Sequence, residues 1–391
     1  MLEEEKILDF RINLNEERDL SDEEINDKYA SGDIRIVTEQ SRFQLNIVPT
    51  IVDSEDYILD PEFQRRHRWS NAKKSRLIES FIMNVPVPPI FLYETEFSVY
   101  EVMDGLQRLT AIYEFYKDKF ALTNLEEWSE LNGRTYSQLP KQVKRGIDRR
   151  YLSSMILLKE TARDPKEENR LKQLVFERIN SGGEPLDEQE KRNALYNGDL
   201  NRLCINLSRT DSFCKLWNIP LDSDDEMSLV ENPLYKKMTD VELVLRFFAF
   251  RQINLWERMT LTKFLDLYLM KGNEFPEKVY ENLSEIFMKT VDLVYNVLGE
   301  DALYLYRKRN GKWIVYNRPT KVLYDTIMQV FSKYLEFDTV LIRKSLEIRD
   351  GLQEFYEVNY QLFEGRNTGK TDVIKRIEVF EQYLRKFLTE E

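Results

Sequence analysis

The chain has 391 residues, of which 42% are hydrophobic, and it carries a formal net charge of −12. This length and composition suffice for a sizeable core and for two or three domains of a soluble globular protein. No run of about 18 apolar residues is present, which argues against a membrane-spanning helix. The acidic balance argues against a protein that coats DNA through a uniformly basic surface, although a local basic patch remains compatible with it.

Histidine and cysteine are almost absent, because the chain contains only His67, Cys204 and Cys214. One chain therefore cannot assemble a Cys/His zinc site, and a Ser-His-Asp triad would have to use His67. We interpret the two thiols as small core residues rather than as a redox pair. Residues 1–5 lack the basic and apolar parts of an export signal, so we expect a cytoplasmic protein with no membrane partner.

The first third of the chain changes from an acidic arm to an α+β pattern. Residues 1–33 are dense in Asp and Glu, and Ser21 followed by Glu24 predicts a short Ser-capped helix within this arm. From residue 34 to about 160, short β-rich runs alternate with helical patterns, which indicates a small mixed sheet with helices. We expect a helix around residues 77–82 and strands at residues 34–37, 43–51, 90–93, 99–103 and 151–158.

Residues 161–391 are predicted to form a mainly helical domain. One exception lies near 303–316, where Asn310-Gly311 between aromatic and β-branched runs indicates a type I′ β-hairpin. Its cations, among them Arg307 and Arg309, could contact nucleic acid, and the alternative is a solvated hairpin that packs on an edge. The expected helices are residues 171–179, 188–196, 241–250, 261–270, 279–297, 321–334, 340–354 and 373–388.

The most informative segment is the predicted junction between the strand at 99–103 and the following helix. Its turn carries Asp104, Gly105, Gln107 and Arg108. A helix N-terminus offers unpaired N–H groups, Gly105 allows close backbone approach, and Arg108 adds a planar fork of donors for phosphate oxygens. Gln107 could orient a water or a ligand edge. The alternative is that Asp104 and Gln107 form a capping box and bind nothing.

A second basic segment lies upstream, between residues 63 and 76. Gln64 and Arg65 could form a second phosphate clamp, and the alternative is a solvated basic face. Trp69 precedes a Ser-capped helix, so we interpret it as a hydrophobic staple rather than as a base-stacking residue. The further candidates for nucleic-acid contact in this segment are Arg66, Arg68, Lys73 and Lys74.

A glycine-containing turn joins the two helices expected on either side of residues 180–187. Gly182 and Gly183 permit left-handed backbone and close approach of a ligand, and Asn180 precedes them. Asp187 and Glu190 are placed as N-cap and capping-box partner of the second helix. A simple turn between helices explains the same residues.

Four ordered segments between residues 57 and 196 resemble the DUF262 family. The box Asp104-Gly105-Leu106-Gln107-Arg108 is similar to the Asp-Gly-Gln-Gln-Arg box of that family. The other segments are Phe63-Gln64-Arg65 with Trp69-Ser70, the proline-rich residues 85–92, and residues 176–196 with Ile179-Asn180, Gly182-Gly183, Arg192-Asn193 and Tyr196.

The resemblance implies a fold similar to the ParB/sulfiredoxin nucleotide-binding domains, as in the GmrS-like N-terminal region of GmrSD-type restriction proteins. It implies a nucleotide-binding, NTP-hydrolysing protein that acts in bacterial defence against foreign DNA, with a nucleoside triphosphate and Mg²⁺ as cofactors. The residues that it assigns to catalysis are Asp104, Gln107, Arg108 and Gln64, and those that it assigns to nucleotide binding are Gly105, Arg65, Asn180, Gly182 and Gly183.

Leu106 departs from the family, which has its first Gln there. If that Gln assists hydrolysis, this chain binds nucleotide and turns it over poorly. The alternative function is therefore a non-enzymatic module in which nucleotide gates attachment to DNA or to a separate nuclease or other effector. Some relatives carry a fused His-dependent HNH-type nuclease domain, but no histidine follows His67, so we predict that this chain is not itself that nuclease. The sequence leaves open whether the chain forms a homo-oligomer.

Overall fold

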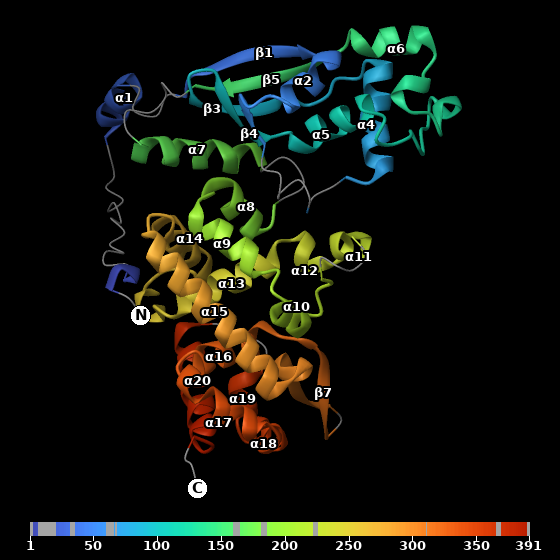
Figure 1. Ribbon diagram of the computed structural model, residues 1–391. Helices are drawn as coiled ribbons and strands as arrows, with labels where there is room; N and C mark the ends of the chain where they lie inside the picture. The colour runs from blue at the N-terminus through green and yellow to red at the C-terminus, as the bar shows by residue number, and fades with distance from the viewer. Residues whose placement is uncertain are drawn as a thin grey trace. The chain divides into compact units, whose positions relative to one another are not determined.

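The computed structural model describes residues 3–6, 21–31, 36–59, 66, 69–158, 165–180, 186–221, 226–309, 311–364 and 369–388 (Figure 1). The chain divides into two compact units. Residues 13–186 form the sheet-bearing unit, and residues 1–12 together with 187–391 form the helical unit. The predicted α+β class, a small mixed sheet with helices and a mainly helical second part, is confirmed.

The sheet-bearing unit is built on a five-stranded mixed sheet with strand order β1-β5-β3-β4-β2. β1 and β5 are antiparallel, β5 and β3 parallel, β3 and β4 antiparallel, and β4 and β2 parallel. Its strands are β1 (Thr38–Gln44), β2 (Tyr57–Ile58), β3 (Ile90–Glu96), β4 (Val99–Asp104) and β5 (Tyr151–Leu157). Its helices are α1 (Asp22–Ser31), α2 (Val48–Val52), α4 (Asn71–Met83), α5 (Leu106–Tyr116), α6 (Lys141–Asp148) and α7 (Pro165–Asn180).

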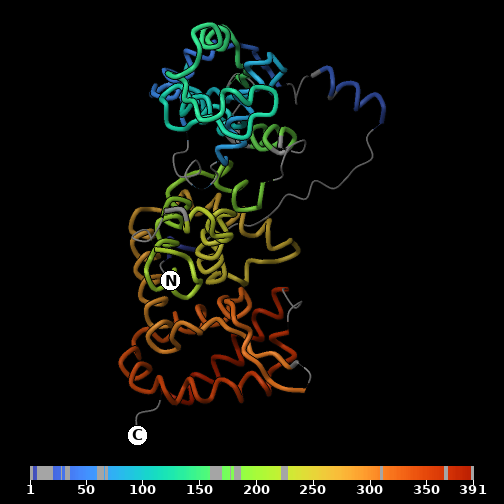
Figure 2. Tube along the Cα trace, turned by 90° about the vertical axis from the view of Figure 1, so that its right-hand side faces the viewer, coloured from blue at the N-terminus to red at the C-terminus, as the bar shows by residue number. Residues whose placement is uncertain are grey.

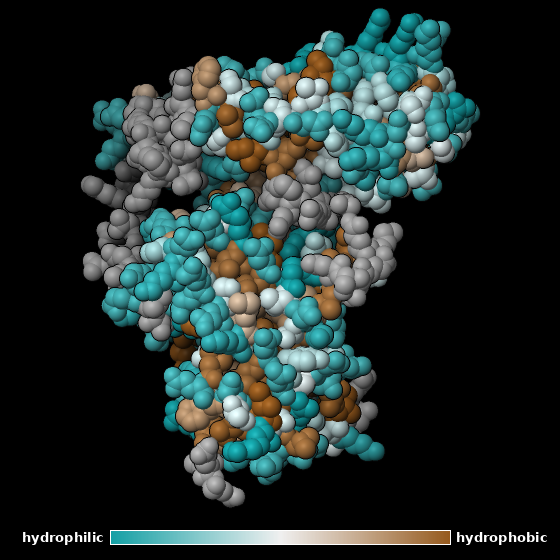
Figure 3. Space-filling view, in the orientation of Figure 1, coloured by the Kyte–Doolittle hydropathy of each residue, from teal (hydrophilic) through white to brown (hydrophobic). Residues whose placement is uncertain are grey.

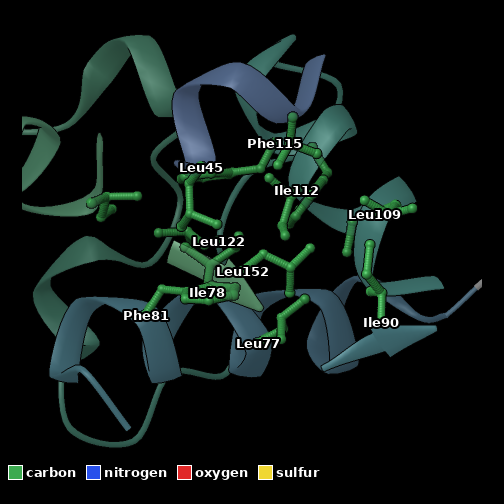
Figure 4. Packing of buried hydrophobic residues seen from close by; sticks show 14 of the residues in the cluster. Leu45, Leu77, Ile78, Phe81, Ile90, Leu109, Ile112, Phe115, Leu122 and Leu152 are labelled. Carbon is green, nitrogen blue, oxygen red and sulfur yellow. The ribbon is translucent and has the colours of Figure 1, made fainter. Parts of the chain in front are cut away.

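The core of this unit lies between the sheet and the helices α2, α4 and α5 (Figure 4). Apolar residues three and four positions apart place Ile78 and Phe81 of α4 against Ile112 and Phe115 of α5. All four are at most 3% exposed, and Leu152 of β5 closes the same cluster. Burying each such side chain stabilises the fold by about 1.5–3 kcal/mol, so this cluster fixes α5 and its first turn on the sheet.

Two strand predictions in this unit are wrong. Residues 43–51 were expected to be one strand, but only Phe43 and Gln44 belong to β1, and a 3₁₀ turn (Leu45–Ile47) and α2 follow. Leu45, Val48 and Ile51 are buried at helical spacing, and Pro49 stands at the start of α2, which its fixed φ favours. Of the strand predicted at 34–37, residues 34 and 35 lie outside the described residues, and residues 36 and 37 precede β1, which begins at Thr38. β1 is a polar strand at the edge of the sheet, so it lacks the apolar alternation that predicts strands.

The helical unit is organised around α15 (Glu277–Leu298), which contacts α9 (Asp199–Leu207) and α10 (Asp211–Trp217) as well as α16 (Lys321–Phe331), α17 (Asp338–Arg343) and α18 (Ser345–Val358) (Figures 1 and 2). The other elements are α8 (Glu188–Leu195), α11 (Glu226–Glu231), α12 (Pro233–Lys236), α13 (Thr239–Phe250), α14 (Leu261–Gly272), β6 (Tyr304–Arg309), β7 (Lys312–Pro319), α19 (Tyr360–Phe363) and α20 (Lys370–Arg385).

Most of the predicted helices of this unit and its hairpin are confirmed, with one correction. The helix expected at 340–354 is two helices that meet at Lys344, the C-cap of α17 and N-cap of α18. β6 and β7 pair antiparallel with Arg309 opposite Lys312, and Gly311 has φ +77°, as a tight two-residue turn requires. Cys204 and Cys214 are both buried and free, so they are core residues as expected.

The acidic N-terminal residues contribute one buried contact to the helical unit. Glu5 is fully buried, and its carboxylate accepts from Arg251 Nε at 2.9 Å and Nη2 at 3.1 Å. Gln252 Nε2 donates to the Glu5 backbone carbonyl at 2.8 Å. A bidentate Arg–carboxylate pair of this kind is geometrically specific, and nothing in the surrounding acidic run distinguishes Glu5 from its neighbours.

Hydrophilic residues cover most of the visible surface around α6, whereas hydrophobic residues are visible elsewhere on both units (Figure 3). Among the described helices, none combines the length and the apolar composition that crossing a membrane requires.

Candidate functional site

The predicted strand-to-helix turn is a single residue. β4 ends at Asp104, α5 begins at Leu106, and Gly105 between them has φ +96°. This left-handed backbone redirects the chain from the sheet into the helix at a position where side chains are disfavoured. The N–H groups of the first turn of α5 therefore point out of the helix without intrahelical acceptors, as expected for a possible anion site.

Gly105 is required by packing inside the protein. A Cβ at this position would lie 2.3 Å from Ile90 Cγ2 and 3.0 Å from Arg108 Nη2. The space that we expected to admit a ligand to the backbone is thus filled by Ile90 of β3. The absence of a Cβ at Gly105 lets Ile90 of β3 and the Arg108 side chain lie close to the turn.

The capping-box alternative is wrong. The N-cap of α5 is Gly105, and no side chain caps the helix. Gln107 does not reach back to Asp104, because its Oε1 accepts from the Trp69 backbone N–H at 3.2 Å. Asp104 is still in the strand, and its carboxylate accepts from Arg108 Nη2 at 2.6 Å. The polar side chains of the box are therefore hydrogen-bonded to each other and to the Trp69 backbone, and they do not cap the helix.

Arg108 is hydrogen-bonded within the protein through one nitrogen of its guanidinium group. Nη2 donates to Asp104 Oδ2 and, at 3.1 Å, to the Pro89 backbone carbonyl, and the side chain is 15% exposed. Nε of the same group is buried, and none of the described residues accepts from it. Gln107 Nε2 is likewise buried, and none of the described residues accepts a hydrogen bond from it. The junction thus contains two buried donors, one of them cationic, without acceptors in the described part of the chain.

Buried unpaired donors are costly, at about 1–3 kcal/mol each and more for charged groups. Together with the first turn of α5 they favour a bound anion, since Arg donors and helix N-termini both suit phosphate oxygens. Within the described ranges no three or more His, Cys, Asp or Glu side chains gather as potential metal ligands. Of the carboxylates in the Asp104–Arg108 box, the described structure offers only that of Asp104, so Mg²⁺ would have to arrive together with the phosphates that complete its coordination.

Several predicted site residues lie outside the described residues and stay predictions. These are Gln64, Arg65, Arg68, the side chain of Asn180, Gly182 and Gly183, as well as His67. The proposed second clamp and the proposed loop over the nucleotide are therefore both untested.

The basic segment before α4 is not one solvated face. Arg66 is 2% exposed, and Lys74 is 8% exposed with its Nζ 2.6 Å from Glu114 Oε2. Both were expected as candidates for nucleic-acid contact, and burial contradicts this because a phosphate could not reach them without displacing their neighbours. Among the described cations of this segment, Lys73 and Arg76 are exposed. The Nζ of Lys73 lies 4.8 Å from the centre of the Trp69 ring, and Arg76 Nη2 lies 3.4 Å from Glu126 Oε1.

Trp69 is confirmed as a hydrophobic staple, because its ring packs against the core cluster ahead of α4. Ser70 caps α4 by accepting from the Lys73 backbone N–H. Sequence reasoning missed two backbone contacts at the junction, in which the Trp69 N–H donates to Gln107 and the Pro89 carbonyl accepts from Arg108. The proline-rich run before β3 was the available signal, since extended proline segments leave carbonyls without intrasegment partners.

The last family-like segment has an architectural role in the helical unit. The predicted capping box is confirmed, with Asp187 as N-cap of α8 and Glu190 as its partner. Arg192 is 2% exposed and donates to Asp266 at 2.7 Å and to Glu242 at 3.1 Å. Asn193 accepts from Asn201 Nδ2 at 2.7 Å. These residues anchor α8 to α9, α13 and α14.

Comparison with known families places the junction in a recognised domain. Residues 48–197 match the family described as GmrSD restriction endonuclease, N-terminal domain. The match contains the Asp104–Arg108 box, Trp69, the proline-rich strand entry and the segment that ends with Arg192 and Asn193. No curated protein and no solved structure matches the chain. Residues 48–197 are thus similar to the N-terminal domain of GmrSD restriction endonucleases, which relates this part of the chain to restriction systems.

Proposed function

We propose that the sheet-bearing unit binds a nucleoside triphosphate at the β4–α5 junction, hydrolyses it, and thereby serves defence against foreign DNA. The observation that carries the proposal is the pair of buried donors, Arg108 Nε and Gln107 Nε2, that the described residues leave without acceptors. The relation to restriction systems supports the defence role.

The proposed roles follow from the contacts at the junction. Arg108 and the first turn of α5 bind phosphate oxygens, and Gln107, oriented by the Trp69 N–H, positions the attacking water. Asp104 neutralises Arg108 before the nucleotide binds, so a phosphate competes with this carboxylate for Nη2. Mg²⁺ bound with the phosphates would offset their charge and that of Asp104. Transfer to water needs no covalent nucleophile, which suits a junction whose described residues include no histidine.

The test is phosphate release from ATP, GTP, CTP and UTP with Mg²⁺ by the parent chain, Arg108→Ala and Arg145→Ala. Arg145 is an exposed arginine of α6 in the same unit and serves as the matched control. We expect turnover of at least one nucleotide by the parent and by Arg145→Ala, and a loss of at least about tenfold in Arg108→Ala. Equal turnover by Arg108→Ala would remove this residue from the site.

One observation favours a second function, a nucleotide-gated binding module without turnover. The position where the family box has its first Gln is Leu106, which is 8% exposed. An amide there would be a buried polar group beside the junction, and the leucine removes it. Nucleotide binding without phosphate release over hours would select this function, and binding would still depend on Arg108.

A further inference from the structure

We propose that the β6–β7 hairpin of the helical unit binds the phosphate backbone of duplex DNA through one basic face. The hairpin lies outside the residues matched to the GmrSD family, and the proposal does not depend on nucleotide binding at the β4–α5 junction. β7 is labelled in Figure 1.

The charge of the hairpin opposes that of the chain. Residues 304–319 contain five cations and no Asp or Glu, whereas the whole chain has a net charge of −12. Positive charge is thus concentrated in one short segment. Local positive potential of this kind attracts polyanions even when the net charge of the protein is negative.

The strand register separates two faces. Lys308 pairs with Trp313 and Tyr306 with Val315, so these residues share one face. Two aromatic side chains of this face pack on the helices: Tyr306 stacks on Tyr356 with ring centres 5.8 Å apart, and the ring centre of Trp313 lies 5.2 Å from that of Tyr360. Val315 of the same face is 45% exposed. Aromatic packing therefore fixes which side of the hairpin turns away from the helical unit.

The opposite face carries the cations. Arg307 pairs with Ile314, and Lys312 lies on the same side as Ile314 two residues earlier along β7. Tyr316 joins this face, since the guanidinium carbons of Arg307 and Arg318 lie 4.3 and 4.8 Å from its ring centre. Such contacts hold the two guanidinium groups in place while leaving their N–H donors free to bind oxygens.

These cations lack carboxylate partners within the described part of the chain: no ion pair is formed by Arg307, Lys312 or Arg318. Lys312 and Arg318 are exposed, and Ile314 is 41% exposed. A Cβ at Gly311 would meet none of the described atoms within 4 Å, so the tip of the hairpin is open. The face therefore presents positive charge that the described chain does not neutralise.

Duplex DNA fits this face better than duplex RNA does. The major groove of B-form DNA is about 12 Å wide and admits a two-stranded β-ribbon, whereas the major groove of A-form RNA is deep and narrow. Three cations on one face predict about three phosphate contacts, and the logarithm of the affinity should then fall with the logarithm of salt with a slope of about −3.

The experiment measures fluorescence anisotropy of a labelled 20-base-pair DNA, a DNA length of about two helical turns, over a range of salt concentrations and without nucleotide. The hairpin variant is Arg307→Gln/Lys312→Gln/Arg318→Gln. The control variant is Lys278→Gln/Arg343→Gln/Lys375→Gln, which removes the same charge from exposed positions of the same unit. Circular dichroism checks that both variants keep the parent fold.

We expect the hairpin variant to bind DNA at least about tenfold more weakly, with a salt slope smaller by about 3, and the control variant to bind within about twofold of the parent. Equal weakening of both variants, or no weakening of the hairpin variant, would overturn the proposal. Equal or tighter binding of duplex RNA would overturn its assignment to DNA. Arg108→Ala is expected to bind DNA like the parent, which separates this result from the nucleotide proposal.

Discussion

Two arginines of the GmrSD-type region, Arg108 in the sheet-bearing unit and Arg192 in the helical unit, use their hydrogen-bonding capacity differently. Arg192 donates to two carboxylates, to Gln189 Oε1 at 3.2 Å and to the Thr262 carbonyl at 3.4 Å. Arg108 has one carboxylate and one carbonyl on a single nitrogen, and its Nε is buried without an acceptor among the described residues.

This difference in hydrogen bonding suggests two possible roles for an arginine in such a motif: it can stabilise the fold, or it can bind a ligand. A buried arginine whose three nitrogens all donate to acceptors within the fold offers little to a ligand, and removing it leaves its carboxylate partners uncompensated. A partly paired arginine leaves a donor that the fold itself does not use. We therefore assign Arg192 to architecture and Arg108 to binding, and the following predictions test that division.

The largest effect is expected for Arg192→Met. This change leaves Glu242 and Asp266 without their shared cation, and removing one partner of a buried ion pair costs about 3–5 kcal/mol. Thermal unfolding followed by circular dichroism should show a strong loss of stability. Arg202→Met is the matched control, because Arg202 is 68% exposed and its one ion pair among the described residues is with Asp199 one turn earlier, so its loss should be almost neutral. Similar unfolding of the two variants would contradict the architectural role.

Gly105→Ala should come next. The added Cβ meets Ile90 in a left-handed backbone, and strain plus overpacking should cost about 2–4 kcal/mol. Gly133→Ala provides the control, because Gly133 has φ +84° but no described atom within 4 Å of its Cβ position. It should therefore lose only the backbone component, about 1–2 kcal/mol. Denaturant titration of both variants measures their free energies of unfolding. Equal losses of stability would show that Ile90 does not clash with the Cβ added at position 105.

Arg108→Ala should affect binding more than folding. Its partly buried bridge to Asp104 is worth about 1 kcal/mol or less, and the change also removes a buried unpaired donor. We expect a ligand-free melting temperature close to that of the parent and at least about tenfold weaker nucleotide binding, equivalent to about 1.4 kcal/mol. A large loss of stability of Arg108→Ala in the absence of nucleotide would show that Arg108, like Arg192, serves the fold.

The smallest effect concerns pH. Burial alone raises the pKa of Glu242, but Lys321 and Arg192 outweigh it and hold the pKa below its ordinary 4.5. This carboxylate therefore stabilises the fold above pH 4.5, and that stability is lost as the pH falls through the lower pKa of the folded state. The stability difference between the parent and Glu242→Gln should narrow below pH 4.5, as thermal melts at several pH values would show. A stability difference between the parent and Glu242→Gln that stays the same at every pH would contradict this linkage between the protonation of Glu242 and folding.

The sequence predicted the elements with regular apolar spacing and missed those whose formation depends on distant partners. The turn around Gly105 was predicted because a β-rich run meets a helical apolar period there, and the hairpin at Gly311 because Asn-Gly between aromatic and β-branched runs favours a type I′ turn. Both glycines have positive φ in the structure. β1 was missed because an edge strand with polar side chains has no apolar period. The residue types of the Asp104–Arg108 box indicated an anion site.

The detailed geometry of that site was beyond prediction. Whether Asp104 accepts from Arg108, and whether Gln107 is oriented by Trp69, depends on where β3 and the start of α4 lie beside the turn. Lys74 and Arg66 were expected on a basic surface because sequence shows charge but not burial. Glu114, the partner of Lys74, lies forty residues away.

The most direct measurement is isothermal titration of ATP, GTP, CTP and UTP, each with Mg²⁺, into the parent chain. The account predicts that at least one nucleotide saturates a single site per chain. It also predicts that inorganic triphosphate competes for this site, because the junction binds phosphates. No binding of any of the four nucleotides at millimolar concentration would contradict the claim that Arg108 and the start of α5 form a phosphate site.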